Sequence, residues 1–345
     1  MKIFNCPSCD AELYFENTEC LSCGKKVGYD FTSSEFVMVD DQGTDIGNGD
    51  FEGFVYCKNY GAISCNWVIL KSSGEFCHSC QLTRTIPSSE DKLNTGNWKR
   101  LETAKRRLLY QLDRLGLPIL YDDFGIRTSL TFDFLTKNNP KKAMTGHSNG
   151  TITILLHEAD SVEREQIRKQ MSEPYRTLIG HFRHEIGHYY WDYFFADSKK
   201  VDAFKEVFGN VNHDYAEALQ SYYRNGPIKN WELDYISPYA SSHPHEDWAE
   251  TWAHYLHLMD TLETASHLGL GFSGTGSGPG LQVCPDPYDE SDFDTLLDFG
   301  LELTRIGNSL NRSMGLPDIY PFVIPETVGH KLGFIHRFLP RDNRV

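Results

Sequence analysis

The sequence predicts an α+β protein, in which a mainly helical domain with a small sheet follows small cysteine-rich β modules. Eight of the nine cysteines lie within the first 80 residues. Farther along the chain, apolar residues recur at helical spacing in several segments, and one β-branched run, 150–156, begins with glycine. The chain has 345 residues, of which 40% are hydrophobic, and this suffices for one small and one large domain.

The first four cysteines form two short pairs, Cys6-x-x-Cys9 and Cys20-x-x-Cys23. Four thiolates at this spacing are typical of a closed structural zinc site. A segment this short buries too little apolar surface to fold alone, so the metal would supply its folding energy. A pair of disulfides is the alternative, which the lack of a secretory signal before these residues disfavours. We expect residues 1–30 to form a four-cysteine zinc ribbon.

A second group of cysteines follows within residues 31–90, and we expect this stretch to form a second four-cysteine zinc-binding module. Its members are Cys57, Cys65, Cys77 and Cys80. Only the last two have the usual knuckle spacing, and the intervening residues 67–70 predict a strand. His78 is an alternative to one of the thiolates. Cys284 lies in a loop rich in Gly and Pro, and we interpret it as an unpartnered thiol.

The segment 86–92 predicts a linker, after which residues 95–345 are expected to form the large domain, opening with a helix at 98–115. That helix carries a basic cluster, which we interpret as a solvated face; it consists of Lys99, Arg100, Lys105, Arg106 and Arg107. The chain as a whole has 33 Lys+Arg against 48 Asp+Glu, a formal net charge of −15. Because affinity for nucleic acid comes mainly from basic residues, this balance argues against a nucleic-acid partner.

The sequence HEIGH at positions 184–188 lies in a segment with helical features. Residues 172–176 have the features of a helix start, with Ser as N-cap, an acidic residue in the first turn and Pro near the first helical position. An apolar stripe at helical spacing follows, formed by Leu178, Phe182, Ile186, Tyr189 and Tyr193. On its flank the helical period brings together His181, His184, Glu185, His188 and Asp192.

Two histidines four residues apart on a helix point the same way and can share one zinc ion, so His184 and His188 are candidate ligands. Glu185 is then placed to accept a proton from the attacking water, which is the arrangement of a metal-dependent peptidase. An ordinary helix with two surface histidines is the alternative interpretation. A catalytic zinc takes three protein ligands and leaves a fourth position to water, so one further ligand must come from elsewhere.

The segment 242–257 predicts a second helix, which opens at Pro244. One side of it is apolar, with Trp248, Trp252, Tyr255, Leu256 and Met259, and its small residues Ala249 and Ala253 favour close packing against the first helix. Glu246 is the candidate third ligand. Glu250, one turn later, is the candidate carboxylate for an imidazole N–H, a partner that ligating histidines usually have.

Three other acidic or histidine side chains compete for these roles. Asp247 and His257 are alternative third ligands, and Asp192 is a second candidate for orienting an imidazole ring. An acidic residue in a first helical turn also favours the positive end of the helix dipole, so Glu246 has a purely structural explanation as well.

The chain resembles a bacterial family of zinc-binding metallopeptidases that carry N-terminal zinc ribbons. The matching stretches are TGHSNGTITILLHEAD, EPYRTLIGHFRHEIGHYYWD, SPYASSHPHEDWAETWAHYLH and LNRSMGLPDIYPF, together with CNW and AKRRLLYQL within residues 55–110. The resemblance covers nearly the whole chain and implies a zincin-like peptidase of the gluzincin type (HExxH…E). It implies little about the substrate.

The EDWAE segment also resembles the third-ligand helix of lethal-factor-type zinc peptidases, in which a Glu of that pattern binds zinc. That resemblance supports Glu246 as a ligand. In those enzymes a tyrosine seven residues earlier faces the metal, and Tyr239 stands at this position here. It implies that Tyr239 donates a hydrogen bond to the oxyanion of the transition state. Tyr235 and His243 are alternatives for this role.

Three further segments have two interpretations each. The strand at 150–156 is either a sheet edge able to pair with a substrate peptide or a core strand. The Gly- and Ser-rich loop 269–280 is either a lid or a surface connector. A helix is predicted at 303–314, where Asn308, Asn311 and Arg312 either line a specificity pocket or tie the helix to the core.

Together these patterns predict a zinc-dependent peptidase that hydrolyses a peptide or isopeptide bond and holds one catalytic and two structural zinc ions. We expect a peptide or protein substrate, a cytoplasmic location, because the thiols must stay reduced, and no membrane span, because no long apolar run is present. The alternatives are a catalytically inactive scaffold that binds protein or nucleic acid, and a zinc hydrolase for a non-peptide amide.

Overall fold

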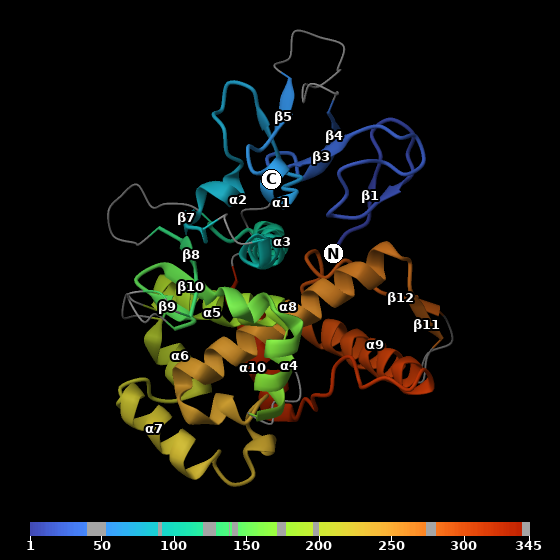
Figure 1. The fold of residues 1–345 in the computed structure, drawn as a ribbon. Coiled ribbons are helices and arrows are strands. Elements are labelled where there is room, and N and C mark those ends of the chain that lie inside the picture. The colour runs from blue at the N-terminus through green and yellow to red at the C-terminus, as the bar shows by residue number, and fades with distance from the viewer. Residues whose placement is uncertain are drawn as a thin grey trace. The chain divides into compact units, whose positions relative to one another are not determined.

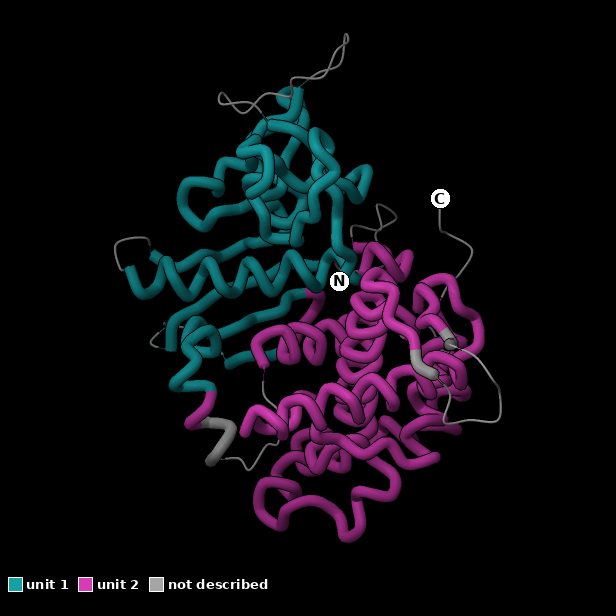
Figure 2. Tube along the Cα trace, turned by 90° about the vertical axis from the view of Figure 1, so that its right-hand side faces the viewer, with its two compact units in different colours: residues 1–111, 130–146, 151–164 teal, residues 112–129, 147–150, 165–345 magenta. Residues whose placement is uncertain are grey.

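The computed structural model describes residues 1–39, 53–88, 92–119, 129–137, 139, 144–170, 177–195, 200–273 and 281–339. They form an α+β protein that is mainly helical with small sheets, as the sequence predicts (Figure 1). The chain divides into two compact units (Figure 2). Unit 1 comprises residues 1–111, 130–146 and 151–164, and unit 2 comprises residues 112–129, 147–150 and 165–345.

Unit 1 begins with short hairpins around the cysteines. The strands are β1 (Phe4–Asn5), β2 (Glu12–Leu13), β3 (Val27–Asp30), β4 (Glu35–Met38), β5 (Phe54–Tyr56) and β6 (Val68–Leu70), with the short helices α1 (Tyr60–Ile63) and α2 (His78–Gln81). The pairs β1–β2, β3–β4 and β5–β6 are antiparallel. Their shared core is aromatic, because the rings of Phe15, Tyr29 and Trp67 pack with centroids 5.0–6.5 Å apart. The strand predicted at 67–70 is confirmed as β6.

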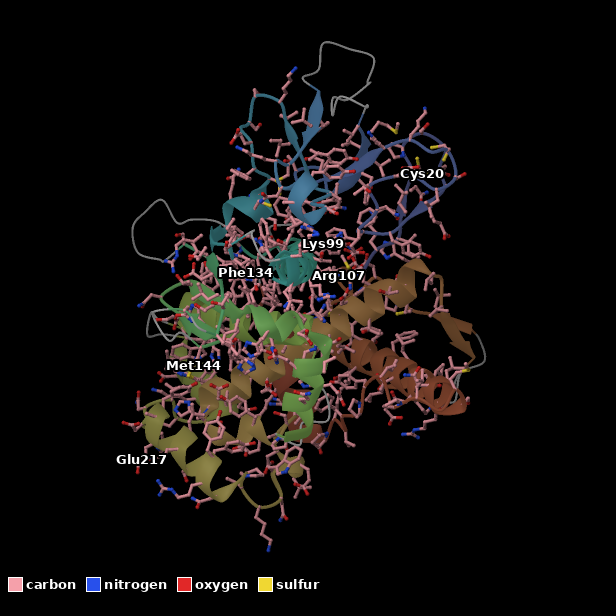
Figure 3. The ribbon with its side chains drawn as sticks, in the orientation of Figure 1. Cys20, Lys99, Arg107, Phe134, Met144 and Glu217 are labelled. Carbon is pink, nitrogen blue, oxygen red and sulfur yellow. The ribbon has the colours of Figure 1, made fainter. Side chains whose placement is uncertain are left out.

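The helix predicted at 98–115 is present as α3 (Lys92–Arg114), which begins six positions earlier. The interpretation of its basic cluster as a solvated face is wrong in part. Lys99 and Arg107, which Figure 3 labels on α3, are exposed, whereas Lys105 is fully buried and Arg106 nearly so. The Lys105 ammonium lies 2.8 Å from the buried Glu102 carboxylate, because a charge removed from water requires a partner.

A four-stranded sheet follows, with the strand order β7-β8-β10-β9, in which β7 and β10 both pair with β8 in parallel. The strands are β7 (Thr83–Thr85), β8 (Thr131–Leu135), β9 (Gly146–Ser148) and β10 (Thr151–Leu155). β10 lies between β8 and β9, and Ile152 and Ile154 are fully buried. The strand predicted at 150–156 is therefore a core strand, and its interpretation as a sheet edge for substrate is wrong. The short helix η1 (Leu156–Ala159) follows it, and α4 (Ser161–Gln170) leads into unit 2.

Unit 2 is built around two helices, α5 (Leu178–Phe195) and α8 (Pro244–His267). They approach each other where Gly187 meets Ala249, and a Cβ added to Gly187 would lie 3.1 Å from the Ala249 Cα. Trp248 and Trp252 are fully buried beside this contact. The predicted opening of the second helix at Pro244 is confirmed, and the small residue Ala249 allows the predicted close packing.

The other elements of unit 2 surround this pair. They are α6 (Val201–Phe208), α7 (Tyr215–Asn225), η2 (Trp231–Leu233), η3 (Tyr239–Ser242), β11 (Gly271–Ser273), β12 (Leu281–Val283), α9 (Phe293–Ser313) and α10 (Glu326–Phe338). The helix predicted at 303–314 is thus the second half of α9. No helix in the described ranges combines the length and the apolar character needed to cross a bilayer.

Three predictions fall wholly or partly outside the described residues: the helix start at 172–176, part of the linker 86–92, and the lid or connector at 269–280, of which 274–280 is not described. The polar residues of α9 contact the loop that follows the helix. Asn308 donates to the carbonyl of Tyr320, Asn311 donates to that of Pro317, and Arg312 forms an ion pair with Asp318. The three side chains thus hold α9 to the loop 317–320, and the choice between a specificity pocket and a tie to the core stays a prediction.

Candidate metal centres

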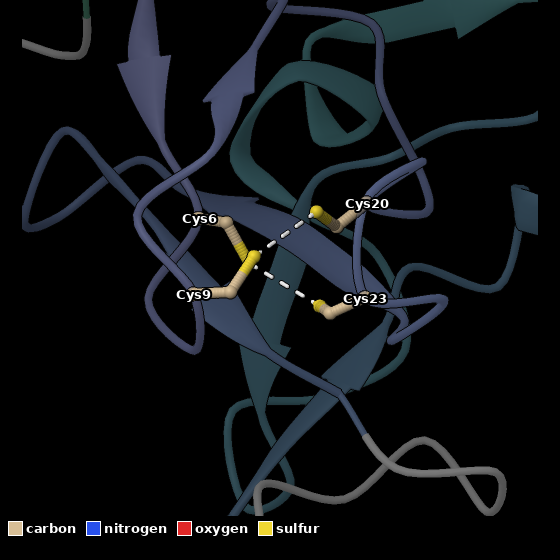
Figure 4. A group of neighbouring side chains, drawn as sticks. All are labelled: Cys6, Cys9, Cys20 and Cys23. Atoms are coloured by element: carbon tan, nitrogen blue, oxygen red, sulfur yellow. Dashed lines mark hydrogen bonds between the residues drawn. The ribbon is translucent and has the colours of Figure 1, made fainter.

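The first four cysteines converge at one point in unit 1 (Figure 4). The Sγ atoms of Cys6 and Cys23 are 3.8 Å apart, and those of Cys9 and Cys20 are 3.7 Å apart. Thiolates on a tetrahedral zinc with Zn–S bonds of about 2.3 Å would be about 3.8 Å apart. A disulfide requires about 2.0 Å, and all nine cysteines are free.

The second cysteine group converges in the same way, and all four of its side chains are buried. The Sγ atom of Cys65 lies 3.6 Å from that of Cys77 and 3.9 Å from that of Cys80, and the backbone N–H of Cys77 donates to Cys57. His78 does not take part: its ring stacks on Phe31 at 4.6 Å. Both cysteine groups therefore have the donor set and spacing of closed zinc sites.

The third centre lies in unit 2, where α5 and α8 face each other. The Nε2 atoms of His184 and His188 are 3.3 Å apart. Glu246, in the first turn of α8, places Oε2 at 3.1 Å from His184 Nε2 and Oε1 at 3.6 Å from His188 Nε2. Two imidazoles and one carboxylate thus meet with their potential ligand atoms within 4.8 Å of one another. This is a donor set of the kind that zinc takes in catalytic sites.

Glu250, one turn after Glu246, orients the first of these rings. Its Oε1 lies 2.7 Å from Nδ1 of His184, and its Oε2 accepts a 2.6 Å hydrogen bond from the Ser237 hydroxyl. A carboxylate at Nδ1 fixes the proton there, so that Nε2 presents a lone pair. That lone pair faces Glu246 Oε2, for which the described residues offer no hydrogen-bond donor. A cation bound by both His184 Nε2 and Glu246 Oε2 would satisfy the two acceptor atoms, so the residues fit a metal ion.

The electrostatics of the third centre also favour a positive charge. Burial opposes a charge on His184, yet the adjacent carboxylates of Glu246 and Glu250 raise the pKa of the imidazole well above its usual value. Burial likewise opposes ionisation of Glu246, yet the two adjacent imidazoles hold its pKa well below the usual range. The carboxylates therefore stabilise a cation at this point, whether it is a proton or a metal ion.

The remaining candidate catalytic residues lie around this centre. Glu185 is next to His184 in α5 and is 9% exposed. The Tyr239 ring centroid is 6.1 Å from that of His184. Burial and the Glu246 charge raise the pKa of the Tyr239 phenol far above its ordinary value, so the group stays a neutral donor.

The alternatives considered for the ligand and donor roles have other partners. Asp247 forms a buried 2.7 Å ion pair with Lys331, and the Lys331 ammonium also lies 4.3 Å from the centre of the Tyr235 ring. Nδ1 of His257 lies 2.5 Å from the Arg183 guanidinium. His243 caps α8, where its side chain accepts the N–H of His245. These are structural contacts. Glu246 remains beside both imidazoles, and Tyr239 beside that of His184.

Two side chains near the centre have contacts that no sequence pattern predicts. The Tyr215 hydroxyl, from α7, donates to Oε1 of Glu246. The side chain of His147 is 6% exposed, and its Nδ1 lies 4.0 Å from the carboxylate of Asp192. Burial, followed by the nearby His188, lowers the pKa of His147 to about 4. Asp192 itself is half exposed and lies one turn beyond His188. Neither Tyr215 nor His147 is part of a recognisable spacing, so only the tertiary structure reveals them.

The fold and the three donor clusters are those of a metal-binding protein with cysteine-rich ribbons and a helical metal centre. Residues 94–338 match the family described as "Putative zinc-binding metallo-peptidase", and residues 3–91 match a family described as a zinc-ribbon domain. The first match covers more than half of the chain, and the chain belongs to this metallopeptidase family.

The chain is also similar to proteins described as uncharacterized from Mycobacterium bovis and from two strains of Mycobacterium tuberculosis. Each is 42% identical over 339 residues, which cover 97% of this chain and 94% of the relative. No solved structure matches the chain.

Proposed function

We propose that the protein is a zinc-dependent peptidase that hydrolyses a peptide or isopeptide bond, with His184, His188 and Glu246 as the metal ligands. The observation that carries this proposal is the meeting of two imidazoles and a carboxylate from α5 and α8, with Glu250 fixing the first ring. Structural zinc sites are closed by four protein ligands. Here the described residues supply three, which is the number of a catalytic site.

Zinc bound at this centre would polarise the scissile carbonyl and make an adjacent water more acidic. Glu185 accepts the proton of the attacking water and delivers it to the departing amine, as a general base and then a general acid. Tyr239 donates its phenol hydrogen to the developing oxyanion, an interaction whose loss commonly costs on the order of a hundred-fold in turnover. The orientation of His184 by Glu250 keeps Nε2 directed to the centre.

The two cysteine groups would hold two structural zincs, and the ribbons would position a protein substrate or partner. The proposed substrate is a peptide or protein, which is what the proposed hydrolysis requires. A nucleic-acid partner is disfavoured because the chain is acidic overall. The proposed location is the cytoplasm, where eight thiols for two zinc sites stay reduced.

Metal analysis tests the ligands directly. Motif counting predicts about three zinc ions per chain, and His184→Ala should remove one of them while both cysteine sites remain filled. A content of about two ions in wild type, indifferent to His184→Ala, would leave only the ribbons and contradict the proposed centre.

Proteome-wide comparison of peptide termini tests the chemistry. Wild type should generate new termini that are absent after treatment with Glu185→Gln, a variant that keeps the size of the side chain and loses the base. Zinc content without any Glu185-dependent product would favour an inactive scaffold. Products lacking new peptide termini would favour a hydrolase of a non-peptide amide, and salt-sensitive retention on DNA or RNA would favour a nucleic-acid-binding role.

A further inference from the structure

The helix α7 is unusual in unit 2 because none of its eleven residues is buried. It is a well-defined helix nonetheless, since Asp214 caps its start by accepting the backbone N–H of Glu217 at 2.8 Å. An exposed helix of this length is only marginally stable on its own in water. Its position must therefore depend on a few specific contacts. Two of these are with side chains of the candidate metal centre.

The first contact is made by Tyr215, the first residue of α7. Its hydroxyl donates a hydrogen bond to Oε1 of Glu246, and its ring lies edge-on to His243 with centroids 5.2 Å apart. His243 caps the helix that carries Glu246. Tyr215 thus contacts both Glu246, the candidate third ligand, and His243, the N-cap of α8. It does so although 41% of Tyr215 is exposed to solvent.

The second contact is made by the other end of the same helix. The Tyr222 ring lies edge-on to the Tyr239 ring with centroids 5.6 Å apart. One helix therefore contacts both the candidate ligand Glu246 and the candidate oxyanion donor Tyr239.

The two oxygens of the Glu246 carboxylate have different surroundings because Tyr215 donates to only one of them. Oε1 receives the phenol hydrogen, whereas Oε2 receives no hydrogen bond from the described residues and faces His184 Nε2 at 3.1 Å. A free carboxylate can rotate about its last bond, but one held through a single oxygen is fixed in orientation. Fixed carboxylates bind metal better because ordering them costs less on binding.

We propose that Tyr215 is a positioning residue for the metal centre: it holds Glu246 so that Oε2 is presented to the metal, and the same bond docks α7 beside the site. The inference rests on the proposed role of Glu246 as a ligand. Tyr215 acts through Glu246 and touches no reacting atom.

The test is a chelator titration of the zinc-loaded full-length protein that follows the His184-dependent ion. Tyr215→Phe removes one oxygen and keeps the ring, and it should weaken this ion by about 10- to 100-fold, as is usual when a partner of a ligand is lost. Tyr223→Phe is the matched control, because it removes a phenol oxygen from the same helix without touching Glu246. It should leave the affinity unchanged, and the cysteine-bound zincs should be unaffected in both variants.

A double-mutant cycle separates positioning from a general loss of structure. If Tyr215 acts through Glu246, Tyr215→Phe should have little further effect on metal affinity in a Glu246→Gln background. An additive effect in that background, or wild-type affinity in Tyr215→Phe, would overturn the inference while leaving the peptidase proposal intact. Lower affinity in Tyr215→Phe together with an absence of any hydrolysis would support the inference and count against the peptidase proposal. If no zinc depends on His184, both fail.

Discussion

Gly187, the fourth residue of the HEIGH sequence, should be intolerant of even one added methyl group. An added Cβ would lie 3.1 Å from the Ala249 Cα, 3.2 Å from the Trp252 Cβ and 3.3 Å from the Trp252 Cδ1. Carbon atoms prefer separations of about 3.5–4.0 Å. The nearest atoms are the Ala249 Cα and the Cβ of the buried Trp252, which no change of rotamer can move. The helices α5 and α8 must therefore separate by roughly half an ångström.

The free-energy change of Gly187→Ala follows from two opposing effects. Overpacking of a filled core costs about 1–3 kcal/mol, while replacing Gly by Ala within a helix gains about 1 kcal/mol. The difference is a net destabilisation of up to about 2 kcal/mol, which would lower the melting temperature by up to about 8 °C. Because the separation also moves Glu246 away from His184 Nε2, the variant should hold the His184-dependent zinc less tightly.

The assay is thermal unfolding with zinc determination on the same samples. Gly329→Ala in α10 is the matched control, since its added Cβ would only meet the Leu297 side chain at an ordinary 3.4 Å. That variant should be as stable as wild type or slightly more stable, and it should retain its zinc. If Gly187→Ala matches wild type in both melting temperature and zinc content, the packing argument for the centre is refuted.

Two further predictions concern the surroundings of the centre. Glu250→Ala should weaken the His184-dependent zinc by about 10- to 100-fold, because Glu250 holds His184 Nδ1 at 2.7 Å; an unchanged chelator titration would contradict this orienting role. Burial lowers the pKa of His254 to about 4 from an ordinary 6.5, so the unfolded chain binds a proton that the folded one does not, and stability should be full above pH 6.5 and fall towards pH 4. Denaturant unfolding should show a shallower fall for His254→Gln, and equal slopes would exclude His254 as a contributor.

Sequence periodicity was sufficient for those parts of the centre that lie on one helix. His184 and His188 share a face because four residues make about one helical turn, which is a local property of the chain. The cysteine pairs are local in the same sense, because a knuckle of two thiols needs only a tight turn. The start of α8 was also predictable, since Pro244 fits the first position of a helix.

Long-range contacts were less predictable. Glu246 had competitors in Asp247 and His257, and nothing in the spacing shows that Lys331 pairs with the first and Arg183 lies against the second. The prediction that Lys105 is exposed was wrong because it, too, depends on a long-range contact. Its partner Glu102 occupies the same buried face of α3, and burial depends on what packs over that face.

The sequence by itself determined which chemical groups this protein can bring to a metal: eight thiols in two quartets, and two imidazoles with a carboxylic acid between them on one helix. The tertiary structure alone decided which distant side chains lie beside those imidazoles: Glu246 beside both rings, Glu250 at Nδ1 of His184, and Tyr215 on Glu246. The physical reason is that a helical period fixes neighbours within a few residues, whereas the approach of the candidate third ligand depends on how closely α5 and α8 pack.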